Sequence, residues 1–383
     1  MLILSAQERI RHIDVVTTQI SAKSCWIFIT VTSYSGVTGV AEATLEKHTA
    51  RMCELIKASG RTLLDKDFLS AYKQCTQSLA ASIIEATCLS ALAGALLDAN
   101  ARIHGVPLAK ALGDVQRNAV DVYANINRRT VDRSALSHAN SARDALQAGH
   151  RAFKIAPFDE MSPELDSSQF AVALEAGLSR IAAIRDAVGF EPDLMVDCHW
   201  RFSPGRLDSL VAALADLKLY WLECPIDESS DNMKALAACR EMCRRHGMLL
   251  AGAETACDYA DLVPFIESHA YDVLMPDIRH IGGPEALSIC GKKLAENDVH
   301  FSPHNPVGPI AAVASLHVCA VSTIAPRLEM QFDESPYFDS LIKPSVGTVI
   351  EGQLRLGDGD GLGVSLDEKI IESMEQADRM SCA

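Results

Sequence analysis

The chain has 383 residues, enough for about two domains, and its 48% hydrophobic and 22% charged residues are typical of a globular protein. Its 50 acidic side chains outnumber the 35 basic ones, which argues against nucleic-acid binding because that needs clustered positive charge. No stretch reaches the roughly 18 uncharged apolar residues of a membrane span, and the N-terminus has no cleavage-like site. We therefore predict a cytoplasmic protein with no nucleic-acid or membrane partner.

The first 115 residues predict a small α+β unit. Residues 13–18 and 26–32 are rich in β-branched residues, and a Ser-Tyr-Ser-Gly turn precedes a third short strand at 39–42. The pattern then becomes helical, most clearly at 82–99, and a Gly-Val-Pro stop signal follows that helix.

Residues 116–340 predict a parallel (β/α) barrel. Short β-branched runs alternate with Ala-rich helical stretches, which favours a closed barrel over the alternative of an open doubly wound sheet. The predicted strands are 120–126, 152–156, 193–197, 219–223, 248–254, 272–277, 299–304 and 324–329. Residues 341–383 are strand-like again and are expected to return to the first unit. The predicted fold class is α/β, a modified TIM (β/α)7-8 barrel with an N-terminal α+β capping domain completed by the C-terminal segment.

The twelve cysteines are scattered along the chain. The closest pair, Cys239 and Cys243, lies in a predicted helix, and no Cys-x2-Cys spacing is present. We predict reduced thiols rather than disulfides or a zinc site. Cys198 and Cys224 each follow an acidic residue at a strand end, so their side chains are expected on the opposite face from those acids.

Titratable residues stand at or near the ends of six predicted strands. The intervals between successive positions are 26, 31, 23, 27 and 25 residues, about one βα unit each. In such a barrel, catalytic residues come from the C-terminal ends of different strands, so these side chains are expected at one mouth. They are Asp197, Glu223, Glu254, Asp277, His304 and Glu329.

Three of these residues predict a metal site. Asp197, Glu223 and Glu254 end consecutive strands, and three anions at close range repel one another unless a cation neutralises them. Oxygen ligands without paired His or Cys favour a hard divalent ion, Mg²⁺ first. For each carboxylate taken alone, a solvated or salt-bridged acid remains the alternative.

The other positions predict acid/base groups. Asp277 and His304 lie on neighbouring strands, so a hydrogen bond that fixes the imidazole tautomer is expected. His199 is two residues beyond the strand-end Asp197 and should share its face, which adds a second acid/base group. Lys154 lies in an apolar strand, where a Lys is costly unless it faces the polar mouth.

These residues together resemble the enolase superfamily, specifically its mandelate racemase branch. The first unit contributes Gly36-Val37-Thr38-Gly39-Val40-Ala41-Glu42, which is similar to that family's capping domain, and Gly359-Asp360-Gly361-Leu362-Gly363-Val364 is similar to its C-terminal return. The barrel contributes Asp197, the run Trp221-Leu222-Glu223-Cys224-Pro225, Glu254, Pro276-Asp277 followed by Gly282-Gly283, His304 and Glu329. The resemblance covers nearly the whole chain, and its strength lies in the order and spacing of motifs that are weak singly.

The resemblance implies a Mg²⁺-dependent enzyme that removes the proton α to a carboxylate. The metal on the three carboxylates would bind the substrate carboxylate, and Lys154 and Glu329 would add a positive charge and a hydrogen bond there. One departure is visible at the second strand, where the family's Lys-x-Lys pair is Lys154-Ile155-Ala156 here. The missing second Lys, with Asp277 in place of a sixth-strand Lys, counts against lactonising and dipeptide-epimerising activities.

The Asp197-Cys198-His199 arrangement is similar to that of the superfamily's sugar-acid dehydratases. We therefore predict loss of water from an aldonate or aldarate, giving a 2-keto-3-deoxy acid, with His304 as the base at C2 and His199 assisting the leaving hydroxyl. A hydroxylated substrate would suit Asn125, Asn127 and Arg128 at the end of the first strand, and Arg128 or Arg129 could hold a second carboxylate or form a surface ion pair. Lys23 and Trp26 lie in a stretch of the first unit that would close over the site.

Two other functions remain open on the sequence alone. A racemase or epimerase of a 2-hydroxy or amino acid would use the same enediolate, and a barrel could bind an acid and Mg²⁺ without turnover. The resemblance also implies a homo-oligomer, because capping domains of the family often meet a neighbouring barrel. The expected partner is a small-molecule carboxylate.

Overall fold

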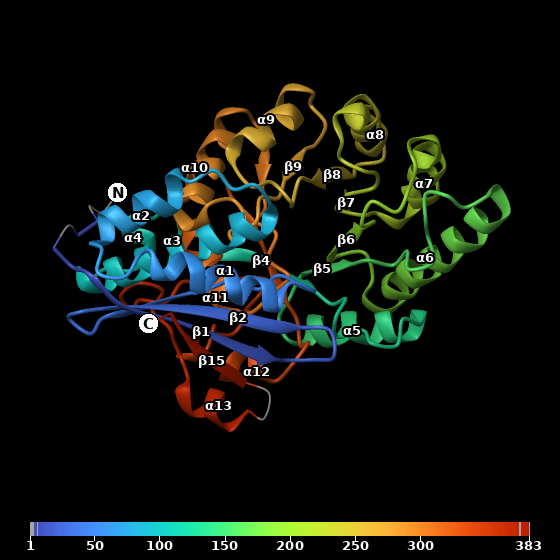
Figure 1. Ribbon diagram of the computed structural model, residues 1–383. Helices are drawn as coiled ribbons and strands as arrows, with labels where there is room; N and C mark the ends of the chain where they lie inside the picture. Colours follow the sequence, from blue (N-terminus) through green and yellow to red (C-terminus); the bar gives the residue numbers. More distant parts are fainter. Residues whose placement is uncertain (1–3, 6, 375–376, 383) are drawn as a thin grey trace.

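The computed structural model describes residues 4–5, 7–374 and 377–382. An N-terminal unit combines an antiparallel sheet with helices and lies against one side of a parallel barrel (Figure 1). In the described residues the sheet has the order β15-β1-β2-β3. The elements of this unit are β1 (Ile10–Gln19), β2 (Cys25–Ser33), β3 (Thr38–Glu42), α1 (Thr49–Arg61), α2 (Phe68–Gln77), α3 (Ile83–Ile103), α4 (Leu108–Leu112) and β15 (Ala377–Ser381).

Helix α3 forms the core of the N-terminal unit. The Ser82 side chain caps it by accepting a hydrogen bond from the Glu85 amide. Strand β3 crosses α3 so closely that a Cβ on Gly39 would lie 2.2 Å from the Ala95 carbonyl oxygen, so only glycine fits there. By length and composition α3 could span a membrane, but 78% of the relevant window is buried inside the protein, as in a core helix.

The barrel contains all eight predicted strands, each hydrogen-bonded to the next in parallel register in the order β10-β9-β8-β7-β6-β5-β4-β11. They are β4 (Ala119–Asn125), β5 (Ala152–Ile155), β6 (Asp193–Asp197), β7 (Trp221–Glu223), β8 (Leu249–Gly252), β9 (Val273–Leu274), β10 (His300–Phe301) and β11 (Arg327–Gln331). The predicted fold class is therefore confirmed as a nearly closed barrel with an N-terminal capping unit.

The barrel is not closed by a strand ladder between β10 and β11. Side chains bridge this seam instead: the Ser302 hydroxyl donates to the Arg327 carbonyl at 2.6 Å, and the Asn305 amide donates to the Glu329 carbonyl at 3.0 Å. These bonds satisfy backbone groups that a ladder would otherwise pair.

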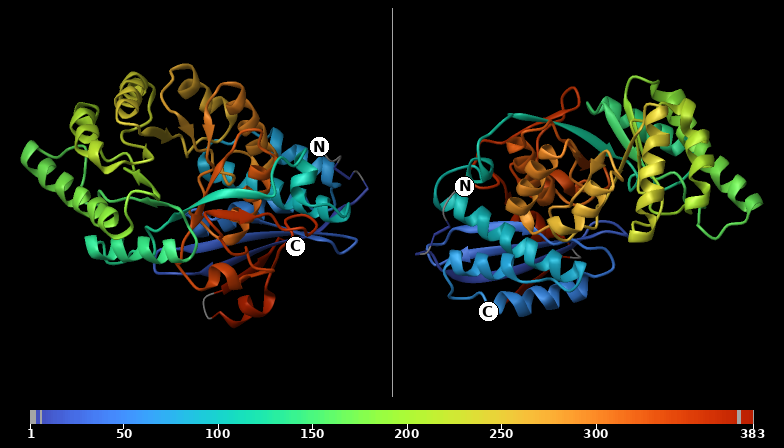
Figure 2. Two further views of the ribbon diagram at one scale, coloured as in Figure 1. Left: turned by 180° about the vertical axis from the view of Figure 1, so that it is seen from behind. Right: turned by 90° about the horizontal axis from the view of Figure 1, so that it is seen from above.

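Helices cover the outside of the barrel, and α6, α7 and α8 form an outer arc on the side away from the N-terminal unit (Figures 1 and 2). On the other side, α10 and α11 contact α3 and β3. The helices are α5 (Ala135–Gln147), α6 (Ser167–Val188), α7 (Leu207–Leu214), α8 (Met233–Arg245), α9 (Tyr259–Glu267), α10 (Gly283–Glu296) and α11 (Pro309–Val321). Within the described part of the chain, 3₁₀ turns lie at Pro204–Arg206, Ala215–Leu217 and Ser230–Asn232.

The C-terminal segment is shared between the two units. As predicted, part of it returns to the first unit, where β15 pairs with β1. The expectation placed the whole segment there, whereas β13 (Gln353–Arg355) pairs antiparallel with β4. The reason lies in strand length: β5 pairs only with the last two residues of β4, so β13 can take up the backbone groups at its start. The remaining elements are α12 (Tyr337–Ser340), β12 (Ile342–Lys343), β14 (Ser365–Leu366) and α13 (Glu368–Ser373).

Candidate active site

Three carboxylates meet where β6, β7 and β8 end. Asp197 and Glu223 are the last residues of their strands and lie opposite each other in register, and Glu254 follows β8 by two residues. All three are buried, and one oxygen of each lies within 4.8 Å of the others. Burial raises the pKa of Glu223 to about 8, and the charges of its acidic neighbours add to the shift although Lys154 opposes it. Such a cluster of oxygen donors can bind a metal ion, which would remove the repulsion between like charges.

Lys154 lies beneath this cluster as a buried cation. Its Nζ lies 2.6 Å from Oε1 of Glu223 and 2.9 Å from Oε1 of Glu329, and Asn125 donates to the same Glu329 oxygen at 2.7 Å. Burial by itself lowers the pKa of Lys154, but the charges of Glu223 and Glu329 outweigh it and hold that pKa well above its usual value. Lys154 therefore supplies a fixed positive charge.

Asp277 and His304 form the hydrogen bond predicted from their positions. Nδ1 of His304 lies 2.8 Å from Oδ2 of Asp277, and Nε2 lies 3.5 Å from Oε2 of Glu254. Asp277 is fully buried. Burial favours its neutral form, but the Arg279 charge outweighs this and places the pKa of Asp277 far below its usual value. An ionised Asp277 accepts a hydrogen bond from the Nδ1–H group of His304. Nε2 is then the ring nitrogen that faces the carboxylate cluster.

The charges around His304 also change its basicity. Burial favours the neutral ring, but Glu254 and the hydrogen bond to Asp277 outweigh it and raise the pKa of His304 to about 9. The ring is thus a stronger base than a free imidazole.

His199 lies beside Asp197 on the same side of the barrel mouth. Its Nε2 is 2.8 Å from Oδ2 of Asp197, and its backbone N–H donates to Oδ1 at 2.8 Å. The shared face was predicted from strand alternation, but β6 already ends at Asp197. His199 reaches its partner through a turn in which it and Trp200 have φ of 48° and 56°. The Asp197 charge raises the pKa of His199 to about 9.

The two arginines considered for a second substrate carboxylate are both in ion pairs within the chain. Arg128 pairs with Glu46 and lies 3.7 Å from Glu334. Arg129 pairs with Asp144 and Asp333. The structure therefore shows the ion-pair alternative for both arginines. The Arg128 pairs link the N-terminal unit to the chain that follows β11.

The other predicted substrate contacts are placed differently from one another. Asn125 lies in the site beside Glu329, as described above, whereas Oδ1 of Asn127 accepts a hydrogen bond from the Ala156 amide at 2.5 Å. Lys23 is exposed. Trp26 is fully buried, with its ring edge-on to Phe28 and Phe338. Contacts of these residues with a substrate stay predictions.

Two functional neighbours were missed by the sequence reasoning. Asn305 donates its backbone N–H to Oε2 of Glu329 at 2.8 Å and is fully buried. Arg279 forms a fork with both oxygens of Asp277. The available signal was adjacency, since Asn305 follows His304 and Arg279 stands two residues beyond Asp277. Adjacency alone does not reveal which side chain turns inward.

The described residues contain no disulfide bond, in keeping with the predicted thiols. Cys198 packs in the hydrophobic core away from the carboxylates, which confirms its expected direction. The expectation for Cys224 was wrong, because its sulfur lies 4.0 Å from Oε2 of Glu254. Strand β7 ends before Cys224, whose φ of 43° turns the side chain back toward the site.

Comparison with known families matches both units. The model described as "Enolase C-terminal domain-like" matches residues 137–370, and "Mandelate racemase / muconate lactonizing enzyme, N-terminal domain" matches residues 2–113. The first of these covers more than half of the chain.

Individual relatives are similar along most of the chain. It is 26% identical to the D-gluconate dehydratase of Thermoproteus tenax, over 90% of this chain and 69% of that protein. It is 31% identical to the D-galactonate dehydratase of Ralstonia nicotianae, over 74% of this chain and 73% of that protein. Among solved structures, a mandelate racemase/muconate lactonizing enzyme-like protein from Rubrobacter xylanophilus superposes with a TM-score of 0.83 at 26% identity, covering 97% of this chain and 98% of that one.

Proposed function

Since the chain belongs to the enolase superfamily, in its mandelate racemase / muconate lactonizing enzyme branch, we propose that it removes water from a sugar acid, an aldonate or aldarate. The chain is an enzyme, a hydro-lyase, in keeping with its dehydratase relatives. Their names, which specify D-gluconate and D-galactonate, support the substrate class. The observation that carries the proposal is the buried Asp277–His304 pair, whose free ring nitrogen faces the carboxylate cluster.

His304 would start the reaction as general base at C2 of the substrate. In the neutral ring Nδ1–H donates to Asp277, so Nε2 carries the lone pair, and Asp277 stabilises the imidazolium that forms. The charge of Glu254 helps to raise the pKa of His304 to about 9, and a cation held by the three carboxylates would offset that charge and favour the neutral ring that a base needs. Removing a proton next to a carboxylate moves negative charge onto the carboxylate oxygens. The Lys154 ammonium is held nearby by Glu223 and Glu329, where it can stabilise that charge as it develops.

The carboxylate cluster fits a divalent cation by its chemistry. Asp197, Glu223 and Glu254 offer oxygen donors within 4.8 Å of one another, and their mutual repulsion is relieved by added positive charge. We propose Mg²⁺, which when bound would supply positive charge to the substrate carboxylate. Removing metal with EDTA and adding Mg²⁺ back tests this assignment directly, and full activity in EDTA would contradict it.

His199 would act as the acid that releases the C3 hydroxyl. Its pKa, raised by Asp197 to about 9, keeps the ring protonated at neutral pH. The imidazole ring is ion-paired with Asp197 in this structure, and it would turn away from Asp197 to reach a substrate. The C2–H and C3–O bonds break, water leaves with the proton from His199, and the resulting enol becomes a 2-keto-3-deoxy acid.

The experiment is a screen of aldonates and aldarates for 2-keto acid release, run in D₂O with Mg²⁺. We expect keto acid from at least one substrate, and its loss in both H304N and H199N. Exchange of the C2 hydrogen and formation of an epimer without any keto acid would instead establish an epimerase. Neither exchange nor keto acid with any substrate tested would contradict the proposal.

A further inference from the structure

A run of hydrogen bonds connects the N-terminal unit to the Asp277–His304 pair through Arg279. Nε of Arg279 lies 3.0 Å and 3.2 Å from the two Asp277 oxygens, and Nη2 donates to Oδ2. Nη1 donates to the Thr44 carbonyl oxygen in the N-terminal unit at 2.6 Å. Arg279 is 5% exposed and Asp277 is fully buried, so water does not compete with these bonds.

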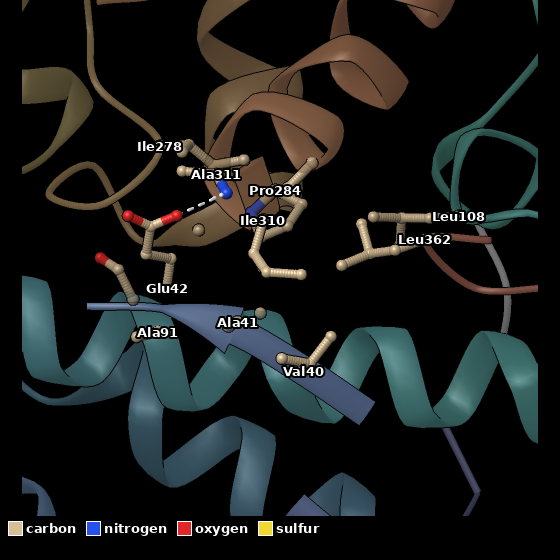
Figure 3. A pocket seen from close by; sticks show the side chains of 14 residues that line it. Val40, Ala41, Glu42, Ala91, Leu108, Ile278, Pro284, Ile310, Ala311 and Leu362 are labelled. Carbon is tan, nitrogen blue, oxygen red and sulfur yellow. Dashed lines mark hydrogen bonds between the residues drawn. The ribbon is translucent and has the colours of Figure 1, made fainter. Parts of the chain in front are cut away.

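The Thr44 end of this run is itself held firmly. The Thr44 hydroxyl donates to Oε1 of Glu42 at 2.7 Å and accepts from the Ile27 amide at 3.0 Å. Glu42 is buried at the end of β3 and accepts from the Gly308 and Ala311 amides at the start of α11. Figure 3 shows Glu42 directed from β3 toward α11, with the bond to Ala311 drawn.

Both members of the catalytic pair are thus tied to the same part of the N-terminal unit. Asp277 is tied through Arg279, and His304 lies four residues before Gly308 on the segment that leads into α11. A small cavity of about 20 Å³ lies where the N-terminal unit meets the barrel, and Glu42 and Ile278 are among the residues that line it (Figure 3). Ile278 is the residue after Asp277, so this contact between the two units lies next to the catalytic pair.

The guanidinium fork also sets the orientation of the Asp277 carboxylate. Oδ2 accepts from His304 Nδ1 and from Arg279, while Oδ1 accepts from the Arg279 side chain and its backbone N–H. A planar guanidinium can serve two carboxylate oxygens and a third acceptor at once, whereas a lysine ammonium is a point charge on a flexible stem.

We propose that Arg279 is a positioning residue that couples the seating of the N-terminal unit to the orientation of the His304 imidazole. The inference rests on the proposed function in one respect, that His304 is the base. It assigns to the N-terminal unit a role in aligning the base, in addition to covering the barrel.

The test compares R279K and R279M with the matched control R102K. Arg102 also forks onto a buried carboxylate, with Nε 3.0 Å from both oxygens of Asp98, and donates to a backbone carbonyl, that of Val364. It belongs to the N-terminal unit and makes no contact with Asp277 or His304 among the bonds described. R102K therefore measures how the loss of a similar set of arginine hydrogen bonds affects stability, at a site away from the catalytic pair.

We expect kcat to fall about 10-fold in R279K and about 100-fold or more in R279M, because misplacing a catalytic group by about 1 Å costs about 10²-fold. KM should stay within about 2-fold, since substrate binding in the ground state does not need the oriented base. R102K should lower the unfolding midpoint with kcat unchanged. A kcat unchanged in both Arg279 variants, or a loss of kcat in R102K equal to theirs, would overturn the proposal.

An NMR measurement makes the test independent of turnover. The Nδ1–H proton of His304, assigned by its loss in H304N, should shift in R279K and stay unchanged in R102K. R279K retains the charge and so remains informative where R279M does not fold. An unshifted resonance in folded R279K would overturn the coupling. Failure of the wild-type enzyme to dehydrate any sugar acid would instead refute the proposed function, and the NMR result would still decide the role of Arg279.

Discussion

The lower and upper halves of the barrel interior differ sharply in chemistry. The lower half is an apolar cluster in which side chains from successive strands fill the space between them, namely Tyr123, Ala152, Met195, Trp221, Ala251, Val273 and Met275. The upper half holds Lys154 and the buried acids, so its side chains are ionisable rather than apolar. Burying charges costs free energy that apolar packing does not cost, so the upper half is built for chemistry and the lower half for stability.

The two halves meet at single side chains. The Trp221 indole belongs to the lower cluster but donates to Oε2 of Glu223 at 2.9 Å. The Lys154 ammonium lies 5.8 Å from the centre of the Tyr123 ring. The apolar half therefore also fixes the rotamers of the charged half, and substitutions in each half should separate activity from stability.

The largest expected effect is on activity alone. In H304N the side chain can still donate a hydrogen bond to Asp277 but cannot take a proton. We expect kcat to fall by about 10³-fold, within the range for loss of a general base, with an unfolding midpoint close to that of the wild type. Keto-acid release and C2 hydrogen exchange measure the loss. Undiminished C2 exchange would show that another residue is the base.

Substitution of Lys154 should affect both stability and activity, so it should not follow the separation between the two halves. K154M leaves the ionised Glu329 buried without its cation, which is expected to lower the free energy of unfolding by about 3–5 kcal/mol as well as activity. Urea unfolding at neutral pH measures the change, with K73M on the exposed face of α2 as the control. A K154M protein as stable as K73M would mean that Glu329 is neutral in the folded state.

The sequence predicted the charged half well because strand ends are regularly spaced. One βα unit between successive positions was enough to bring together Asp197, Glu223 and Glu254, and to pair Asp277 with His304. The cost of placing a Lys in an apolar strand also predicted that Lys154 faces the polar mouth. These inferences need only the period of the fold, which a single sequence contains.

Features that depend on where a strand stops were predicted less well. Cys224 and His199 lie just past strand ends, where a positive φ replaces alternation. The pairing of β13 with β4 depends on β5 being shorter than its neighbour. Arg279 could be seen beside Asp277 in sequence, but its bond to Thr44 joins positions 235 residues apart. No local pattern contains such a contact.

A substitution in the lower half should have the opposite effect to H304N, because it should lower stability and leave activity unchanged. Met195 is fully buried in the apolar cluster, and M195A is expected to lower the free energy of unfolding by about 2–5 kcal/mol through the lost contacts and the cavity. Turnover per folded molecule should remain close to that of the wild type. L79A removes a side chain that is 96% exposed and serves as the control. A selective loss of kcat in M195A would show that the lower half also tunes the chemistry.

Metal binding should stabilise the upper half. Saturating Mg²⁺ at about 100 times its Kd should add about 2.7 kcal/mol to the wild-type free energy of unfolding, and E254Q should lose most of this gain. The matched control is E228Q. Glu228 is a nearby half-buried acid whose Oε1 accepts from the Ala253 amide and the Tyr271 hydroxyl, and it lies outside the three-carboxylate cluster. Thermal unfolding with and without Mg²⁺ measures the gain, and an equal gain in wild type and E254Q would contradict the metal assignment.

The smallest expected effect concerns histidines remote from the mouth. Burial lowers the pKa of His317 from 6.5 to about 4, and its Nδ1 accepts from the Ala109 amide at 3.0 Å, which requires the neutral ring. His138 and His150 are likewise lowered to about 4 by burial. Below pH 6.5 the unfolded chain binds these protons more readily than the folded one, so stability should fall as the pH falls toward 4.

Each such histidine should contribute about 1–2 kcal/mol of destabilisation between pH 7 and 5. The mouth histidines His199 and His304 behave in the opposite way, because their pKa values are raised to about 9 in the folded protein, so the stability they add is fully present below pH 6.5 and is lost as the pH rises toward 9. H317Q isolates one contribution, since a Gln amide can accept from Ala109 and donate to the Leu362 carbonyl without titrating. Urea unfolding midpoints at pH 7 and 5 should then differ less in H317Q than in the wild type. An identical pH dependence would mean that His317 is already charged in the folded protein, and that the contrast between the mouth and the rest of the barrel does not extend to its histidines.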